Sequence, residues 1–199
     1  MRGGEANDIA QDLNYRHLLF ALFAPGTPEE DDAFQEALAK SRALKDAKDK
    51  SYVKNSGFLH RAKAMAWSRQ LLQTGTVPAW ELSLEMNEVL NAGYWPGACV
   101  GKYLGALAAA EGGRARAEQY FVNAEKAISA NDPPGVVSLI RLTVLTEAYR
   151  SLHDETWLDK ARALAKTLPD AIAPLSLPRW RDYLDNPESA PFPGLLYWY

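Results

Sequence analysis

Residues 104–127 read LGALAAAEGGRARAEQYFVNAEKA and hold two alanine-rich segments on either side of a Gly-Gly pair. Ala, Leu, Glu and Arg favour the α-helix, whereas two consecutive glycines end one. Gly105 and Ala117 are small enough to let two helices approach closely, and Leu104 and Phe121 are large enough to fill the space beside them. The stretch therefore predicts two antiparallel helices in close contact, joined by a short turn.

The same succession of helix and short turn continues along the chain. No segment shows the sustained apolar and polar alternation, with β-branched enrichment, that a strand would have. Proline and glycine mark the helix ends, and Thr27 and Asp154 are placed to cap two of the helices. We expect an all-α fold of about eight to nine helices, at roughly 8–23, 28–47, 58–73, 79–91, 96–111, 114–129, 135–152, 155–168 and 178–184.

Three turns occur at a regular interval. Gly75, Gly112 and His153 each lie inside a successive helix pair, and they are 37 and 41 residues apart. A helical period of this length is typical of a stacked α-solenoid, in which neighbouring pairs share one continuous core. We therefore expect a single domain over residues 1–199, a right-handed α-solenoid of antiparallel helix pairs at about 8–50, 58–92, 96–130 and 135–168, with a C-terminal cap and aromatic tail at 169–199.

The spacing of Leu104-Gly105, Ala117, Phe121 and Ala124 resembles that of the tetratricopeptide repeat (TPR), which favours Leu-Gly, Ala, a large aromatic residue and Ala. The segment AGYWPGACVGKYLGAL also looks like the SEL-like variant of this repeat. The match covers one repeat well and its neighbours poorly, since the next unit has Leu158 where a small residue is expected. The alternative is a generic helical bundle whose alanine-rich sequence meets the spacing by chance.

By this resemblance, a partner would lie along the inner face built from the first helix of each pair. The register of Gly105 places on this face Cys99, Lys102, Tyr103, Ala106 and Ala109, then Thr143, Glu147 and Arg150 in the next unit and Met65, Arg69 and Leu72 in the preceding one. A clamp for a chaperone C-terminus is disfavoured, because Ala106 stands where such a clamp needs Asn beside Lys102. The basic side chains could line a groove for an acidic segment, or could simply solvate the helices. The candidate partner-binding residues are Arg69, Lys102, Tyr103, Glu147, Arg150 and Trp198.

Trp198 belongs to the tail, residues 191–199, which reads PFPGLLYWY and is rich in aromatic residues. Pro191 and Pro193 prevent it from continuing a helix, and a patch this apolar is unfavourable in water. One interpretation is that the tail folds back over the last helix. The other is that it docks on a partner or on a second copy of the chain, which would make a homo-oligomer, or that the chain is part of a longer one.

Composition argues against several classes of function. The net charge of −3 gives no general attraction to nucleic acid or to anionic lipid, so we expect neither as a partner. His17, His60 and His153 lie far apart, with no second ligand at metal-binding spacing, and Cys99 has no local nucleophile signature. We predict no catalytic site, no cofactor and no metal. The first residues lack the apolar core of a signal peptide, which favours a cytoplasmic location.

The sequence thus predicts a non-enzymatic protein that binds another protein or peptide, in the role of an adaptor, a chaperone or an immunity protein. Six Trp and nine Tyr supply side chains that commonly anchor such interfaces. The alternative is a helical regulatory domain that senses a small ligand in a pocket enclosed by Trp-bearing helices. A closed apolar cavity would favour the sensor, and an open groove would favour the peptide binder.

Overall fold

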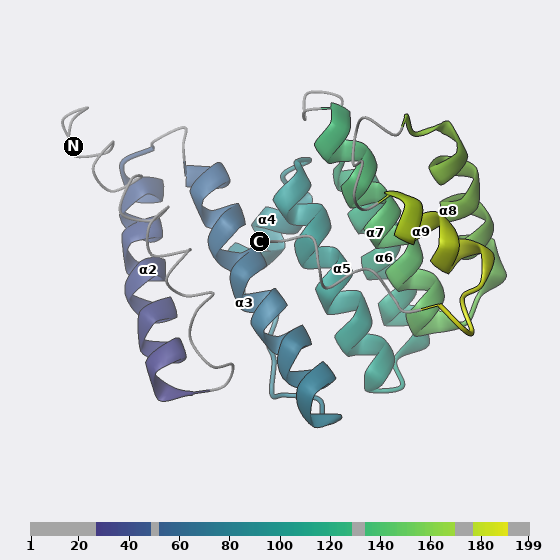
Figure 1. Ribbon diagram of the computed structural model, residues 1–199. Helices are drawn as coiled ribbons and strands as arrows, with labels where there is room; N and C mark the ends of the chain where they lie inside the picture. The colour runs from purple at the N-terminus through teal and green to yellow at the C-terminus, as the bar shows by residue number, and fades with distance from the viewer. Residues whose placement is uncertain (1–26, 49–51, 129–133, 170–176, 191–199) are drawn as a thin grey trace.

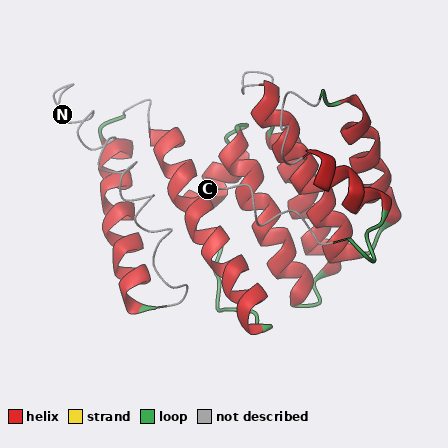
Figure 2. Ribbon diagram, viewed as in Figure 1, coloured by secondary structure: helices red, strands yellow, loops and turns green. Residues whose placement is uncertain are grey.

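The computed structural model describes residues 27–48, 52–128, 134–169 and 177–190, and every regular element in these ranges is an α-helix (Figure 1; Figure 2). The expected all-α class is therefore confirmed. The described helices are α2 (Pro28–Asp46), α3 (Tyr52–Thr74), α4 (Leu84–Asn91), α5 (Trp95–Ala110), α6 (Arg114–Ala127), α7 (Pro134–Leu152), α8 (Glu155–Thr167) and α9 (Leu177–Asp185). The helix expected at 8–23 and the tail lie outside the described residues.

Local capping signals set several of these boundaries. The Thr27 hydroxyl accepts a hydrogen bond from the backbone N–H of Glu30 at 3.3 Å, and the Asp154 carboxylate accepts one from the N–H of Thr156 at 3.0 Å. Both are the N-caps that the sequence predicts. Within the three expected turns, Gly75, Gly112 and His153 all adopt a positive φ, which ends the preceding helix in the left-handed region.

Two predicted boundaries are wrong. Helix α3 begins at Tyr52, six residues before the expected start, and α4 begins at Leu84 instead of close to Pro78. Ser83 caps α4 by accepting a hydrogen bond from the N–H of Met86 at 3.1 Å, and residues 75–83 form a connection instead of a helical turn. A tertiary contact holds this connection away from a helical turn: the Trp80 indole N–H donates to the Glu111 carboxylate at 2.9 Å.

The helices pack in order along the molecule. Each helix from α2 to α9 contacts the next one in the chain, and α3, α5 and α7 also contact one another in sequence to form a layer. Helices α4 and α6 contact each other and cover one side of α5. Figure 1 shows the helices side by side, from α2 at one end to α8 at the other. Helix α5 is central, so nearly all of its residues are buried.

Residues 104–127 form a close helix–helix contact in the larger core. The Phe121 side chain is completely buried, and a Cβ atom at Gly105 would lie 2.8 Å from its ring. A Cβ atom at Gly101 would lie 2.9 Å from Cβ of Ala124. These distances are too short for real side chains, so α5 and α6 can approach this closely only because α5 carries glycine at both positions.

A Gly97→Ala substitution is expected to lower the free energy of unfolding by about 1–3 kcal/mol, the usual cost of overpacking. A Cβ atom at Gly97 would lie only 2.4 Å from the backbone oxygen of Val89, so α4 and α5 would have to separate. Urea denaturation followed by circular dichroism measures the change. In an uncrowded helix the same substitution stabilises by roughly 0.5–1 kcal/mol, and a gain of that size would contradict the close contact.

A second, smaller core joins α2 to α3. Its buried residues come from the facing sides of these two helices: Phe34, Ala37, Leu38, Leu44, Tyr52, Leu59, Ala62 and Ala66. Near its centre the His60 ring is completely buried and meets the ring of Phe34 edge-on, with 5.9 Å between ring centroids. Neither ring nitrogen of His60 has a hydrogen-bond partner in the described part of the chain. Ion pairs from Arg42 to Glu85 and from Lys45 to Glu88 attach α2 to α4 as well.

Two arginines tie α8 and α9 together at their C-terminal ends. Arg181 of α9 donates to the backbone oxygen of Leu168 at 2.9 Å, just beyond the end of α8. Arg162 of α8 donates in return to the backbone oxygen of Leu184 near the end of α9, also at 2.9 Å. Carbonyl groups in the last turn of a helix have no intrahelical donor, so each arginine supplies a donor at or near a helix end.

Candidate binding cleft

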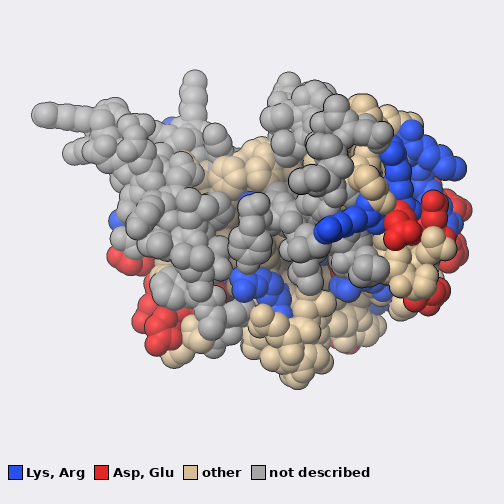
Figure 3. All heavy atoms as spheres, viewed as in Figure 1, with Lys and Arg blue, Asp and Glu red and all other residues tan. Residues whose placement is uncertain are grey.

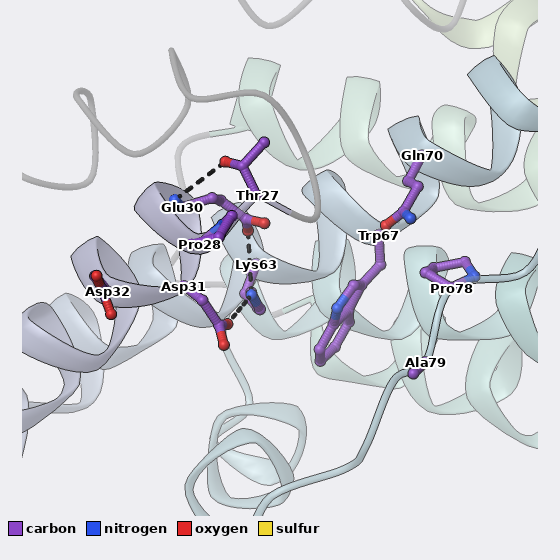
Figure 4. Close-up of a pocket in the computed structure, with 10 residues that line it drawn as sticks. All are labelled: Thr27, Pro28, Glu30, Asp31, Asp32, Lys63, Trp67, Gln70, Pro78 and Ala79. Carbon is purple, nitrogen blue, oxygen red and sulfur yellow. Dashed lines mark hydrogen bonds and ion pairs between the residues drawn. The ribbon is translucent and has the colours of Figure 1, made fainter.

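A cleft of about 550 Å³ opens between the first turns of α2, the second half of α3 and the 75–83 connection (Figure 4). It is partly open to solvent. Its lining residues come from these three segments: Thr27, Pro28, Glu30, Asp31, Asp32, Lys63, Trp67, Gln70, Pro78 and Ala79. Because α2 and α3 run antiparallel, the acidic start of α2 lies beside the part of α3 that carries Lys63 and Trp67 (Figure 4).

The wall formed by α2 is acidic. Residues 28–32 read PEEDD, so four carboxylates follow the proline in the first helical positions. Negative charge is stabilised there because the N-terminus of a helix carries about half a positive charge. Asp31 and Asp32 are exposed, and acidic side chains gather over the start of α2 at the lower left of Figure 3. Glu30 is the exception, with only 1% of its surface exposed.

Lys63 neutralises part of this wall from the floor of the cleft. Its ammonium lies 3.2 Å from Glu30 Oε1 and 2.9 Å from Asp31 Oδ1 (Figure 4). It also lies over the rings of Phe34 and Trp67, at 5.2 and 5.7 Å from their centroids. The Lys63 side chain is 9% exposed, so this cation is enclosed by carboxylates and aromatic faces and holds α2 against α3.

The wall opposite the acids is aromatic and apolar. It consists of Trp67 of α3 with Pro78 and Ala79 of the connection (Figure 4). Trp67 contacts Trp80 with 6.5 Å between ring centroids, and the guanidinium of Arg116 stacks over Trp80 at 4.4 Å. A cleft with carboxylates on one side and an indole on the other suits a cation carried on an apolar stem.

The residues that the sequence analysis singled out lie elsewhere. Lys102 and Tyr103 are buried in α5, with the Lys102 ammonium 4.3 Å from the centroid of the Tyr103 ring. Glu147 is buried in α7, where it accepts hydrogen bonds from Arg150 at 3.0 Å and from Ser151 at 3.3 Å.

The structure therefore places the side chains of Lys102, Tyr103 and Glu147 in internal contacts. Arg69 is partly buried on α3, and Trp198 lies outside the described residues. None of the five described candidates lines the cleft between α2 and α3.

Cys99 and possible metal ligands were the other features considered in the sequence. Cys99 is completely buried, and this burial raises the pKa of its thiol, which keeps it protonated. Within the described ranges, no group of three or more His, Cys, Asp or Glu side chains could hold a metal ion. No helix in the same ranges is long and apolar enough to cross a membrane.

Comparison of the chain with protein-family models, with curated proteins and with solved structures finds no match.

Proposed function

We propose that this protein is a non-enzymatic binding module that recognises another protein or a peptide through its helical surface, and that the cleft between α2 and α3 is one of its contact sites. The observation that carries the proposal is the cleft itself. It places a tryptophan face opposite two exposed carboxylates in a preformed hollow. Tryptophan in such a setting is a frequent anchor of protein interfaces.

The proposed architecture is a right-handed, TPR-like solenoid of helix pairs. The contacts of α3, α5 and α7 with one another, and of α4 with α6, support it, because stacked pairs bring alternate helices together. The turn spacing and the close contact at Gly105 and Phe121 agree with the same arrangement. In this proposal the protein acts as an adaptor, a chaperone or an immunity-type protein.

The proposal concerns a peptide or protein partner instead of a small ligand. The cleft is partly open and its lining includes acidic, basic and amide side chains, unlike the enclosed apolar cavity of a small-molecule sensor. An acidic partner is not favoured at this place, because the exposed charges of the cleft are carboxylates.

A Trp67→Ala substitution is expected to weaken partner binding by roughly tenfold or more, the effect typical of an interface tryptophan. The full chain would first capture partners from a native lysate. A partner identified by mass spectrometry would then be purified and titrated against both proteins by calorimetry. Leu84→Ala is the matched control, because Leu84 is 82% exposed on α4 and does not line the cleft.

Comparing the two variants shows whether the partner contacts the cleft or another part of the surface. Loss of binding in Trp67→Ala, with Leu84→Ala unchanged and circular dichroism intact for both, would support the cleft as a contact site. Equal binding by both variants would remove the cleft from the interface. Failure to identify any partner that binds the purified chain would count against the whole proposal.

A further inference from the structure

We infer that the cleft between α2 and α3 receives a basic side chain, arginine or lysine, from an extended segment of the partner. The inference rests on the proposed function for the class of partner and adds the chemistry that is recognised. In this arrangement, the cationic group meets the carboxylates of Asp31 and Asp32, and the apolar stem of the side chain lies against Trp67.

The charge of the cleft favours a cation. Among the described residues that line it, three carry a carboxylate, Glu30, Asp31 and Asp32, whereas only Lys63 is cationic. The positive end of α2 adds only about half a charge, so the negative sign remains. Complementary charge of this kind speeds encounter with a partner and sets its orientation.

Lys63 does not neutralise all of these acids. Its ammonium is buried next to Glu30, and it reaches only one oxygen of Asp31, whose side chain remains 66% exposed. Asp32 is exposed and makes no ion pair or hydrogen bond from its side chain with other described residues. The side-chain amide of Gln70, across the cleft from Asp32, likewise has no such partner in the described chain. Two carboxylates and an amide thus face the opening.

Two other tryptophans of the protein, Trp80 and Trp157, make cation–π contacts within the fold. Arg116 stacks over Trp80 at 4.4 Å and Lys160 lies over Trp157 at 4.5 Å, measured to the ring centroids. Trp67 already contacts Lys63 on the cleft floor and packs against Trp80 at 6.5 Å between ring centroids. A cation–π contact contributes about 0.5–2 kcal/mol, depending on how well it is desolvated, so the partly exposed Trp67 indole can add to the attraction of the carboxylates.

The test uses the full chain and three fluorescein-labelled peptides that differ only in charge. One alternates glycine with arginine, and in the other two every arginine is replaced by glutamine or by glutamate. Fluorescence polarisation measures binding at low and at physiological salt. We expect the arginine peptide to bind, the glutamine peptide to bind at least tenfold more weakly, and the glutamate peptide to show no binding. Binding of the arginine peptide should weaken as salt increases.

Asp32→Lys is the deciding variant, because it reverses the charge of a side chain that makes no ion pair or hydrogen bond with other described residues. Asp46→Lys is its control: it makes the same change in net charge at the opposite, exposed end of α2. We expect Asp32→Lys to weaken binding of the arginine peptide by roughly tenfold and Asp46→Lys to change it by less than about twofold. Thermal denaturation of both variants checks that the fold is kept.

Four results would overturn the inference: equal binding of the arginine and glutamine peptides, equal weakening by the two variants, no binding at millimolar peptide, or equally strong binding of agmatine. Agmatine carries the guanidinium group without a peptide, so this last result would identify a small amine as the ligand. If an identified partner binds wild type and Asp32→Lys equally, the proposed function stands, and only the inference that a basic side chain enters the cleft is wrong.

Discussion

Replacing Phe121 by alanine is expected to lower the free energy of unfolding by about 3–5 kcal/mol, the range for removing a large aromatic ring from a core. The ring is completely buried, lies 6.2 Å from the ring of Trp157 between centroids, and closes over the bare backbone of Gly105. It therefore joins α5, α6 and α8 at one point. Because α5 supplies that backbone and cannot move into the space without disturbing its other neighbours, the cavity would remain largely open.

Urea denaturation monitored by circular dichroism measures this loss, and Leu84→Ala again serves as the control. Leu84 is exposed, so its truncation should change the free energy of unfolding by less than about 0.5 kcal/mol. If Phe121→Ala cost no more than the control, the close contact between α5 and α6 would not exist as described. A Phe121→Leu variant, which refills most of the volume, should recover part of the stability.

Acidification is expected to destabilise the protein through His60. Burial lowers the pKa of His60 from its ordinary value of 6.5 to about 4 in the folded state. The unfolded chain therefore binds more protons at this residue between these two pH values. The contribution of His60 to the free energy of unfolding should fall as the pH decreases through this window, by about 3 kcal/mol in total, and level off below it.

The charged groups around His60 have opposite effects on its pKa. Glu85 and Glu88 of α4 favour its protonation, and Arg42 of α2 opposes it, so burial remains the main cause of the lowered pKa. A His60→Leu variant should lose most of the pH dependence between pH 7 and 4.5, whereas His153→Gln, at an exposed turn, should keep it. The decisive quantity is the difference in urea unfolding between wild type and His60→Leu. A constant difference across this range would contradict a neutral, buried imidazole.

The sequence predicted the helices well wherever their signals were local. Thr27 and Asp154 cap helices within three residues of themselves, and Gly112 ends α5 through its own backbone conformation. The opening stretch also predicted the close packing of α5 on α6, because glycine, alanine and phenylalanine have a direct steric meaning at that spacing.

Boundaries that depend on distant residues were not predictable in this way. Pro78 is favourable at the start of a helix, yet residues 75–83 form a connection in which Trp80 bonds to Glu111, 31 positions away. No local pattern encodes a contact of that range. The start of α3 at Tyr52 was missed because the charged tract before it resembles a solvated helix end.

The cleft was missed for a related reason. Acids in the first turn of a helix commonly complement its dipole, and a tryptophan in a helix commonly packs against neighbouring helices, so neither pattern predicts a cleft by itself. The ion pair between Lys63 and Glu30, 33 positions apart, brings the acidic start of α2 next to the part of α3 that carries Trp67. Lys102 and Tyr103 were placed on an inner face by register, but register does not tell an open face from a covered one. Helix α5 has neighbours on nearly every side, so both residues are buried.

The separate small core between α2 and α3 makes the cleft depend on local unfolding. Helix α2 supplies one wall. Its core packs on α3, and the ion pairs of Arg42 and Lys45 connect it to α4. If α2 opened while the larger core stayed folded, the cleft would disappear, so a ligand that needs both walls must oppose that opening. At a concentration one hundred times its Kd, such a ligand would raise the free energy of the opening by about 2.7 kcal/mol. Amide hydrogen exchange confined to α2 would then report occupancy of the cleft without any label on the ligand.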